Sequence, residues 1–371
     1  MTAEATPWPP AWPRALGLTS DMAPDRVSGM GSHEALPAGD YRAVPEDFVV
    51  EECLGFSPEG SGEHLWLWVE KRALTTHELA RMLAQVCGVR ERDIGYAGMK
   101  DRQAVTRQWL SVHLPGREAP EDIQAALDAR LASDDARSVR LLDQARHPRK
   151  LKRGVHRGNH FLLRLSGDVV DDPMLESRWQ RLIEGGVPNY FGPQRFGPDG
   201  RNLARARALL ARGWRKRDDR QGMLLSAARS YLFNQLLAAR IVDNSWATPL
   251  PGELVMLEGT ASQFLVDDVD DELRERAARL DVHPSGVLWG SGRLASQDQA
   301  AERERAMIAS EPELAAGLEA AEVRMGRRPL RLRLDAPRLA RDGHELRLAF
   351  GLPRGAFATA VLRELMTHPT L

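Results

Sequence analysis

The distribution of hydrophobic periodicity along the chain is the feature that most limits its possible folds. Runs of β-forming residues or of alternating apolar and polar residues, typical of strands, occur near both ends, whereas helical periodicity dominates from about residue 179 to residue 328. Strand-rich ends around a helical middle predict one domain of helices and strands that is interrupted by an inserted domain. The strand-like segments are residues 47–53, 65–69, 105–114, 160–165, 330–334 and 345–350, and helices are expected at residues 119–131, 226–241 and 356–366.

Short local signals refine this pattern. The turn-rich residues 55–62 separate the first two strand-like segments, so we expect those two segments to pair. Asp342 and Gly343 form a hairpin signal between the two C-terminal segments. Thr75 and Glu78 have the spacing of a capping box, which predicts a further helix that begins near Thr75.

Composition excludes several classes of protein. The 371 residues are 43% hydrophobic, which is enough for one large domain or two smaller ones. No apolar run approaches the ~20 residues that a membrane-spanning helix needs. Only two cysteines occur, without a CxxC pair or a His/Cys cluster at zinc spacing, which indicates a reducing compartment and no structural metal. We therefore expect a soluble, cytoplasmic protein.

The first 37 residues differ from the rest of the chain. Prolines flank Trp8 and Trp12, and the charged start and apolar middle of a signal peptide are missing. We expect a poorly ordered extension. A short segment that binds a partner through the two tryptophans is the alternative.

Charge is balanced over the whole chain but unevenly distributed. Lys and Arg total 51 and Asp and Glu 52, so bulk charge gives no support for binding nucleic acid. Residues 146–164, however, contain seven Lys or Arg and no acidic residue, and residues 201–220 contain eight against two acidic residues. Such clusters can bind a polyanion by releasing counterions from its phosphates, although a solvated surface is the ordinary alternative. Gly154 and Gly158 break helical periodicity in the first of these clusters, residues 146–164. This favours a basic loop that contacts RNA.

The strongest candidate for chemistry is Asp101, which follows a pair of glycines and precedes a strand. It lies between Lys100 and Arg102, and flanking cations keep a carboxylate ionised even when it is partly removed from water. Asp101 is therefore a credible nucleophile or general base. On local grounds alone, a surface Lys-Asp-Arg turn is the simpler explanation.

Residues 98–108 (GMKDRQAVTRQ) resemble the catalytic motif of the D-type tRNA pseudouridine synthases, the TruD family. Five further segments resemble that family in the same order along the chain. They are residues 45–52 (PEDFVVEE), 152–161 (KRGVHRGNHF), 186–197 (GVPNYFGPQRFG), 226–235 (SAARSYLFNQ) and 352–359 (LPRGAFAT). Together the six segments span nearly the whole chain after the first 37 residues.

The resemblance implies a fold of the α+β class. The expected fold is a pseudouridine synthase catalytic core, with a mixed, mainly antiparallel sheet and helices, that carries an inserted, family-specific α/β TRUD domain. The expected domains are the poorly ordered extension at residues 1–37, the first part of the catalytic domain at 38–180, the inserted TRUD domain at 181–328 and the C-terminal part of the catalytic domain at 329–371.

The resemblance also implies a reaction, the isomerisation of a uridine in tRNA to pseudouridine, at position 13 in bacterial members. The uracil is detached from its ribose, rotated and rejoined through carbon. No redox change or net hydrolysis occurs, so neither a metal nor an organic cofactor is implied. The expected partner is tRNA, with no membrane and no obligate protein partner.

Site residues follow by the same resemblance. Asp101 matches the catalytic nucleophile, which attacks either the uracil ring or the ribose C1′. Phe48 and Phe357 match aromatic positions around the flipped-out base, for which core packing is the alternative. Asn159 matches an amide that contacts the base or ribose, and a turn residue capping the strand is its alternative. Arg42 lies where a Lys or Arg holds the carboxylate ionised, and an ordinary exposed arginine is the alternative there.

The residues expected to bind the RNA backbone lie in the basic loop and in the segment 186–197. They are Arg149, Lys150, Lys152, Arg153, Arg157 and Arg195.

Two other classes of protein fit part of the sequence. A non-catalytic RNA-binding or RNA-chaperone protein would keep the basic blocks and the aromatic residues but would not need Asp101. An aspartate-dependent hydrolase would need a second catalytic carboxylate or a metal cluster, and neither is found at convincing spacing.

Overall fold

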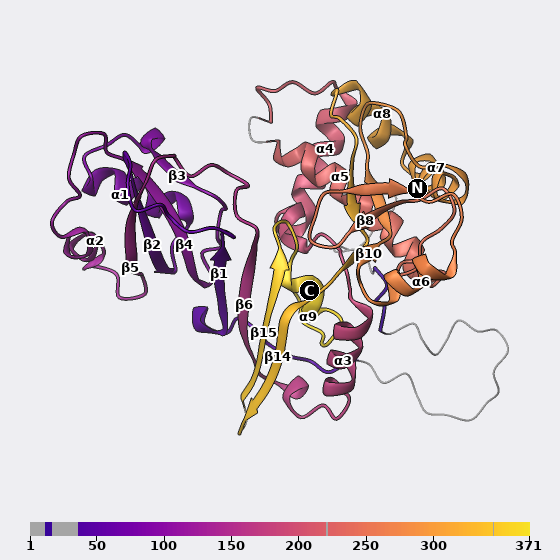
Figure 1. Ribbon diagram of the computed structural model, residues 1–371, viewed down its shortest axis with the longest axis horizontal. Coiled ribbons are helices and arrows are strands. Elements are labelled where there is room, and N and C mark those ends of the chain that lie inside the picture. The colour runs from indigo at the N-terminus through magenta and orange to yellow at the C-terminus, as the bar shows by residue number, and fades with distance from the viewer. Residues whose placement is uncertain (1–11, 17–35, 220–221, 344) are drawn as a thin grey trace, which may run out of the picture. The chain divides into compact units, whose positions relative to one another are not determined.

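The structure, a computed structural model, describes residues 12–16, 36–219, 222–343 and 345–371. The chain divides into two compact units, each built from separate stretches of sequence (Figure 1). The sheet unit comprises residues 38–172 and 335–355. The helical unit comprises residues 173–334 and 356–371, together with the described residues before Ala38.

An eight-stranded sheet forms the centre of the sheet unit. All of its pairs are antiparallel except the parallel pair of β1 with β4, so the expected mixed, mainly antiparallel sheet of an α+β protein is confirmed. In spatial order the strands are β14 (Asp335–Asp342), β15 (Glu345–Pro353), β6 (Gly158–Leu165), β1 (Phe48–Cys53), β4 (Val105–His113), β2 (His64–Arg72) and β5 (Ser138–His147), and β3 (Ile94–Tyr96) also pairs with β4.

The predicted pairing of the first two strands is wrong. In the structure β4 lies between β1 and β2, parallel to β1 and antiparallel to β2. Turn residues such as those at positions 55–62 show only that the chain changes direction. They do not decide which strand fills the neighbouring place in the sheet, because that depends on segments distant in sequence.

The hairpin at Asp342 and Gly343 is present, but one of its strands was misplaced. β14, the edge strand, occupies residues 335–342, whereas the predicted segment 330–334 contributes β13 (Arg331–Leu332), which pairs with β7 (Val187–Pro188) in the helical unit. β14 is largely exposed and carries charged side chains, as edge strands often do. It therefore lacks the apolar alternation that marks a buried strand.

Two helices cover one face of the sheet. α1 (Thr76–Val86) begins at the predicted capping box, in which Thr75 Oγ1 accepts from Glu78 N at 3.2 Å and Glu78 accepts from Thr75 N at 2.8 Å. α2 (Ile123–Leu131) is capped by Asp122 and is shorter than expected. Their apolar faces pack with the inward side chains of β2 and β4 in one buried core.

The helical unit is built around α5 (Met223–Val242), which confirms and extends the helix expected at residues 226–241. In one small sheet β8 pairs with both β10 and β9, and in another β11 pairs with β12. The other elements are α3 (Leu175–Gly185), α4 (Arg201–Ala211), α6 (Asp271–Ala278), α7 (Asp298–Ser310), α8 (Pro312–Ala320), α9 (Ala358–Leu362), β8 (Leu254–Leu257), β9 (Gln263–Leu265), β10 (Val282–His283), β11 (Ser285–Leu288) and β12 (Gly326–Pro329).

The two units do not have the boundaries expected for the catalytic and inserted domains. Residues 356–371, expected in the catalytic domain, cluster with the helical unit, since Ala360 belongs to the core around α5. The expected closing helix at 356–366 is also shorter, because only α9 is α-helical there. The functional division of the chain stays a prediction, while the contacts define the units used below.

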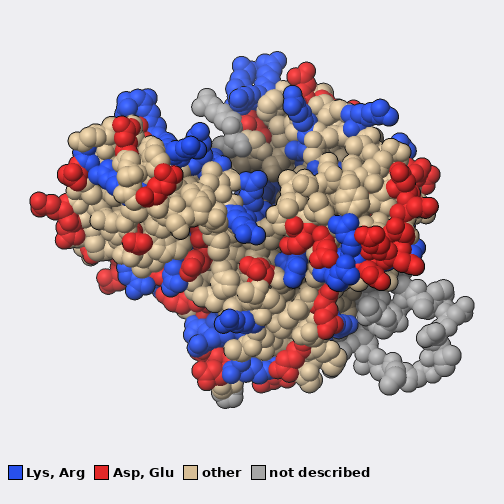
Figure 2. All heavy atoms as spheres, viewed as in Figure 1, with Lys and Arg blue, Asp and Glu red and all other residues tan. Residues whose placement is uncertain are grey.

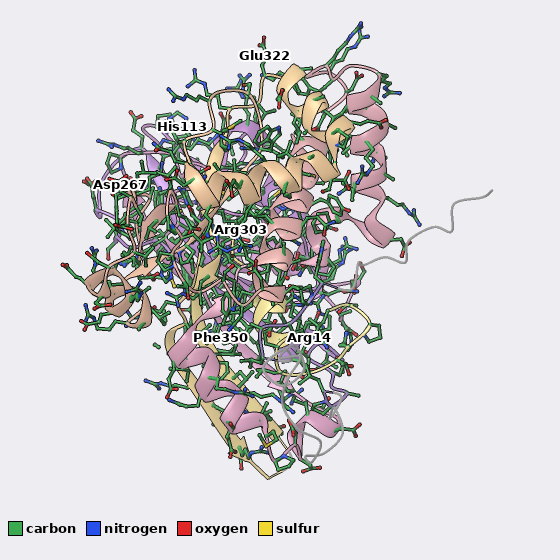
Figure 3. The ribbon with its side chains drawn as sticks, turned by 90° about the vertical axis from the view of Figure 1, so that its right-hand side faces the viewer. Arg14, His113, Asp267, Arg303, Glu322 and Phe350 are labelled. Atoms are coloured by element: carbon green, nitrogen blue, oxygen red, sulfur yellow. The ribbon has the colours of Figure 1, made fainter. Side chains whose placement is uncertain are left out.

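Residues 12–16 pack against the helical unit. Trp12 Nε1 donates to Gln235 Oε1 at 3.0 Å, and its ring stacks on Tyr190 with 5.8 Å between centroids. Arg363 Nη2 donates to the Trp12 carbonyl at 2.6 Å, and Arg14 follows on the same segment (Figure 3). This short piece of the predicted extension is therefore held in place, while Trp8 and the other residues before Leu36 lie outside the described part.

Over the described ranges, the structure has no helix that is both long and apolar enough to span a bilayer.

Candidate active site

Asp101 lies on the loop of residues 97–104, which leaves β3 and returns as β4. The first residues of β4 pair with β1, so the loop ends beside the start of that strand. The Asp101 side chain is exposed, whereas Lys100 and Ala104 in the same loop are buried. The loop thus presents one carboxylate to solvent from an otherwise anchored backbone.

Buried polar side chains hold this loop. Lys100 N donates to Thr76 Oγ1 at 2.8 Å, and that hydroxyl donates to Gln108 Oε1 at 2.8 Å. Gln108 Nε2 in turn donates to the Gly98 carbonyl at 3.4 Å. Thr76 and Gln108 have almost no exposed surface, so the bonds are shielded from water. The first turn of α1 and the second half of the motif at 98–108 therefore clamp the loop together.

The side chain of Lys100 turns into the protein and away from solvent. Its Nζ donates to Glu52 Oε2 at 2.9 Å and to Asn159 Oδ1 at 2.9 Å. The Lys100 and Glu52 side chains are 5% and 0% exposed, and burial raises the pKa of Glu52 while the Lys100 charge opposes that rise. The pair thus belongs to the interior, where removal of either partner would leave an uncompensated charge.

The two cations that flank Asp101 in sequence have other carboxylates as partners. Lys100 pairs with Glu52, and Arg102 pairs with Glu78 at the start of α1. Both cations thus have ion-pair partners other than Asp101, and their expected effect on its ionisation stays a prediction. Adjacent side chains on an extended loop point in different directions, which a linear sequence does not reveal.

A third cation, Lys71, bonds to the Asp101 backbone. Its Nζ donates to the Asp101 carbonyl at 2.8 Å and also to the Leu74 carbonyl. Lys71 is fully buried, and burial lowers its pKa to about 8 while the Asp101 charge opposes the shift. Sequence reasoning missed Lys71, although the inward alternation of β2 at positions 65, 67 and 69 continues to it.

Arg42, the expected helper of Asp101, lies against aromatic rings. Its guanidinium carbon is 4.3 Å from the ring centroid of Tyr41 and 5.1 Å from that of Phe48. Its Nε and Nη2 are buried and have no hydrogen-bond partner within the described ranges. These contacts give Arg42 a fixed position, while its action on the Asp101 carboxylate stays a prediction.

Phe48 and Asn159 come from neighbouring strands, β1 and β6. Phe48 is only 4% exposed and contacts Tyr41 and Phe161 with centroid distances of 5.8 and 6.0 Å, so core packing accounts for its present contacts. Asn159 is the second residue of β6, and its amide oxygen accepts from Lys100 in the loop of Asp101. Asn159 is thus part of the network behind Asp101.

Phe357 and Arg195 belong to the helical unit. Phe357 immediately precedes α9, and its ring meets the edge of Phe191 with 6.0 Å between centroids. The Arg195 guanidinium carbon is 5.7 Å from the Phe357 ring centroid, and Arg195 Nη1 donates to Ser226 Oγ at 3.0 Å. The structure therefore gathers Asp101, Asn159, Phe48 and Arg42 in one unit, and Phe357 and Arg195 in the other.

The basic loop, residues 148–157 between β5 and β6, packs beside β3. A Cβ on Gly95 of β3 would lie 2.4 Å from the Leu151 carbonyl oxygen, so this approach requires glycine. Gly154 N also donates to the Ala97 carbonyl at 2.8 Å, which ties the basic loop to the loop of Asp101. Of the predicted RNA-binding residues in it, Arg149, Lys152, Arg153 and Arg157 are exposed and Lys150 is half-buried.

His156 of the basic loop lies against the motif at residues 98–108. A Cβ on Gly98 would be 3.2 Å from His156 Cε1 and 3.1 Å from Lys100 Nζ. Burial lowers the pKa of His156 to about 4, and the charges of Lys100 and Arg354 add to the effect. His156 is therefore neutral near pH 7, so the positive charge of this loop comes from its Lys and Arg side chains.

Both signs of charge occur on the face shown in Figure 2. Acidic side chains gather around the part of the helical unit where Figure 1 places α6, which begins with Asp271 and Glu272. Acidic regions of this kind offset the basic segments of the sequence, so the total charge of the chain stays near zero. Over the described ranges, no three His, Cys, Asp or Glu side chains lie close enough to hold a metal ion.

Comparison with known proteins identifies the family. The family model described as tRNA pseudouridine synthase D (TruD) matches residues 34–216 and 217–365. A tRNA pseudouridine synthase D of Chromohalobacter salexigens is 57% identical over 371 residues and is matched over 100% of both chains, including the N-terminal segment. One of Pseudomonas aeruginosa is 43% identical over 351 residues, which are 93% of this chain and 94% of the relative.

A solved structure supports the same assignment at the level of fold. It is described as a tRNA pseudouridine synthase D (TruD) from Methanosarcina mazei and has a TM-score of 0.63 at 20% identity. The match covers 90% of this chain and 94% of that chain. From the family model and the sequence relatives, the chain belongs to the tRNA pseudouridine synthase D (TruD) family.

Proposed function

We propose that the protein converts a uridine of tRNA, at position 13, to pseudouridine and that Asp101 is the nucleophile. Membership of the TruD family makes the protein a pseudouridine synthase, which is an isomerase. The observation that supports the more specific proposal is the exposed Asp101 carboxylate on a loop clamped by buried bonds. A nucleophile needs this combination of access and fixed position.

The reaction conserves every atom of the substrate. Asp101 forms a bond to the uracil ring or to ribose C1′, the C1′–N1 bond breaks, and the detached uracil rotates. A bond then forms between C1′ and C5, the C5 proton leaves while N1, no longer bonded to ribose, gains a proton, and the carboxylate is released. The target base must first leave its stack, and aromatic side chains can replace lost stacking at ~1–3 kcal/mol per base. We assign that role to Phe48 and Phe357, and we assign contact with the base or ribose to Asn159.

The exposed cations of the basic loop are the proposed tRNA-binding surface of the sheet unit. They lie on a loop that is bonded to the loop of Asp101 through Gly154 and Ala97. Phosphates bound there would therefore be held at a fixed distance from the carboxylate. Contacts of this kind position the RNA without reading its sequence. The proposal places the protein in the cytoplasm, together with its tRNA substrate.

The test is conversion of an unmodified tRNA transcript by purified protein without added cofactor. Wild-type protein should form pseudouridine at one position, and Asp101→Asn should form none, because an amide is a far weaker nucleophile than a carboxylate. Arg102→Gln, a change at the adjacent exposed residue, serves as the matched control and should retain activity. Base-resolution mapping of pseudouridine identifies the position.

The outcomes separate the candidate functions. Unaltered conversion by Asp101→Asn would remove Asp101 from the role of nucleophile. Tight tRNA binding by the wild type without any conversion would instead favour the non-catalytic RNA-binding or RNA-chaperone alternative.

A further inference from the structure

We propose that Lys71 is the positioning residue of Asp101. Its ammonium holds the backbone carbonyl of Asp101 in place and puts a positive charge near the carboxylate. The inference deepens the proposed function and rests on the role given there to Asp101. Lys71 does not reach the solvent, because its side chain is fully buried. It can therefore act on the reaction only through the loop.

Lys71 joins two segments that are separate in sequence. It is the penultimate residue of β2, and its ammonium donates to the carbonyls of Leu74 and Asp101. Leu74 directly precedes the capping residue of α1, so the same ammonium connects the end of β2, the start of α1 and the catalytic loop. Loss of this one group would release the backbone of Asp101 itself.

The local backbone is shaped to allow these bonds. Ala73 has φ of 54°, in the left-handed region that side chains with a Cβ rarely adopt. The turn it makes brings the Leu74 carbonyl back onto the Lys71 ammonium. Such strained conformations persist only where the surrounding structure holds them, and the bonds of Lys71 supply part of that hold.

Within the described residues, the positive charge of the buried Lys71 is stabilised by backbone carbonyls and not by a contacting carboxylate. Across the described chain it makes no ion pair in contact, and carbonyl dipoles surround its ammonium. Among titratable groups, Asp101 and Glu78 favour its charged form, while Lys100 disfavours it. Asp101 has the larger effect of the two charges that favour the ammonium, which agrees with the bond between Lys71 and the Asp101 backbone.

This interaction matters most when substrate binds. The Asp101 carboxylate is exposed in the free protein, and a base placed against it would remove water from it. Removal of water raises the free energy of the ionised carboxylate. A nearby buried cation then stabilises it more strongly, because the effective dielectric constant falls. Lys100 and Arg102 are already paired with Glu52 and Glu78. Besides Arg42, whose action on the carboxylate stays a prediction, Lys71 can therefore supply this charge.

The test compares Lys71→Met and Lys71→Arg with wild type under single-turnover conditions. Methionine keeps the length of the side chain without charge or donors, whereas arginine keeps both. Lys71→Met should lower the rate of conversion on the order of tenfold to hundredfold, with tRNA affinity unchanged. Arg72→Met, which removes the neighbouring half-buried cation paired with Glu46, is the matched control and should keep the wild-type rate.

The dependence of the single-turnover rate on pH distinguishes positioning by charge from a structural role. In the wild type the rate should fall as pH rises through about 8, where the buried ammonium loses its proton. Lys71→Met should lack this decline. Lys71→Arg should move it to higher pH, because the guanidinium stays protonated to above about pH 12. If Lys71→Met does not fold, the shift in Lys71→Arg still decides the question.

Two outcomes would overturn the proposal. One is a wild-type rate in folded Lys71→Met, and the other is an alkaline decline that is the same in wild type and Lys71→Arg. Failure of the proposed function looks different, since wild type would then form no pseudouridine or Asp101→Asn would retain activity.

Discussion

Around Asp101, three lysine and arginine side chains have three different partners. Lys100 is paired with Glu52, Arg102 with Glu78, and Lys71 with two backbone carbonyls. The sequence shows the first two as neighbours of the aspartate and hides the third, which is 30 residues away along the chain. At the scale of single residues, proximity in sequence was therefore a poor guide to which cation bonds to Asp101.

The half-buried His156 of the basic loop gives a prediction about pH. Because the pKa of His156 is lowered to about 4, the unfolded chain binds a proton between pH ~6.5 and ~4 that the folded protein does not. The free energy of unfolding should thus decrease as pH falls through this range. NMR titration of the His156 ring measures its pKa directly.

Replacement of His156 by Gln is the variant that checks this linkage. His156→Gln should unfold with a weaker dependence on pH between about 4 and 6.5 than the wild type does. Identical pH dependence in the two proteins, or a ring that titrates near its ordinary pKa, would show that the histidine is not held neutral.

At the scale of elements, the start of α1 links stability to the site. Thr75 caps the helix, and Thr76 in its first turn accepts from Lys100 N in the loop of Asp101. The helix is thus a structural support for the loop as well as a cover for the sheet.

Thr75→Ala tests this link. Loss of the cap should lower the free energy of unfolding by about 1 kcal/mol, measured by chemical denaturation. It should also lower the rate of pseudouridine formation and speed hydrogen exchange at the Lys100 amide. Asp122→Ala removes the cap of α2 and is the matched control, for which a similar loss of stability without any loss of rate is expected. Equal effects of both variants on the rate would contradict a specific role of α1.

Local rules predicted the elements of this fold better than their arrangement. The cap of α1, the extent of β4 and the turn after β14 follow from side chains within a few positions of one another. The place of β4 between β1 and β2, and the pairing of β13 with β7, depend on contacts between distant segments that periodicity does not encode. For the same reason, Asp101 could be nominated from its motif, but its partner Lys71 could not.

At the scale of the whole molecule, positive charge is concentrated in two segments, although the net charge of the chain is near zero. The basic loop combines exposed cations with a bond to the catalytic loop, whereas the second basic block, residues 201–220, begins in α4 and extends beyond the described residues at Arg220. The first block therefore remains the better candidate for contact with RNA.

Simultaneous replacement of Arg149, Lys150 and Arg153 by Ala should weaken tRNA binding and reduce its dependence on salt. The slope of log affinity against log salt should decrease in magnitude by roughly 0.7–0.9 for each phosphate that the variant no longer binds. A triple change of Arg215, Lys216 and Arg217 in the second block is the matched control. Binding that is undiminished in the first variant, or equally reduced in both, would mean that the basic loop is not the main site of phosphate binding.

The discontinuity of both units has a consequence for synthesis on the ribosome. β6 pairs with β1 on one side, but its other edge is filled by β15, which emerges only after residues 173–334 of the helical unit have been translated. Until β15 pairs with it, β6 is an exposed edge strand of the nascent sheet. Exposed edge strands can pair with other chains. The helical unit also waits for its last segment, since Arg363 near the C-terminus binds the carbonyl of Trp12. Neither half of this protein can be completed before nearly all of the chain has left the ribosome.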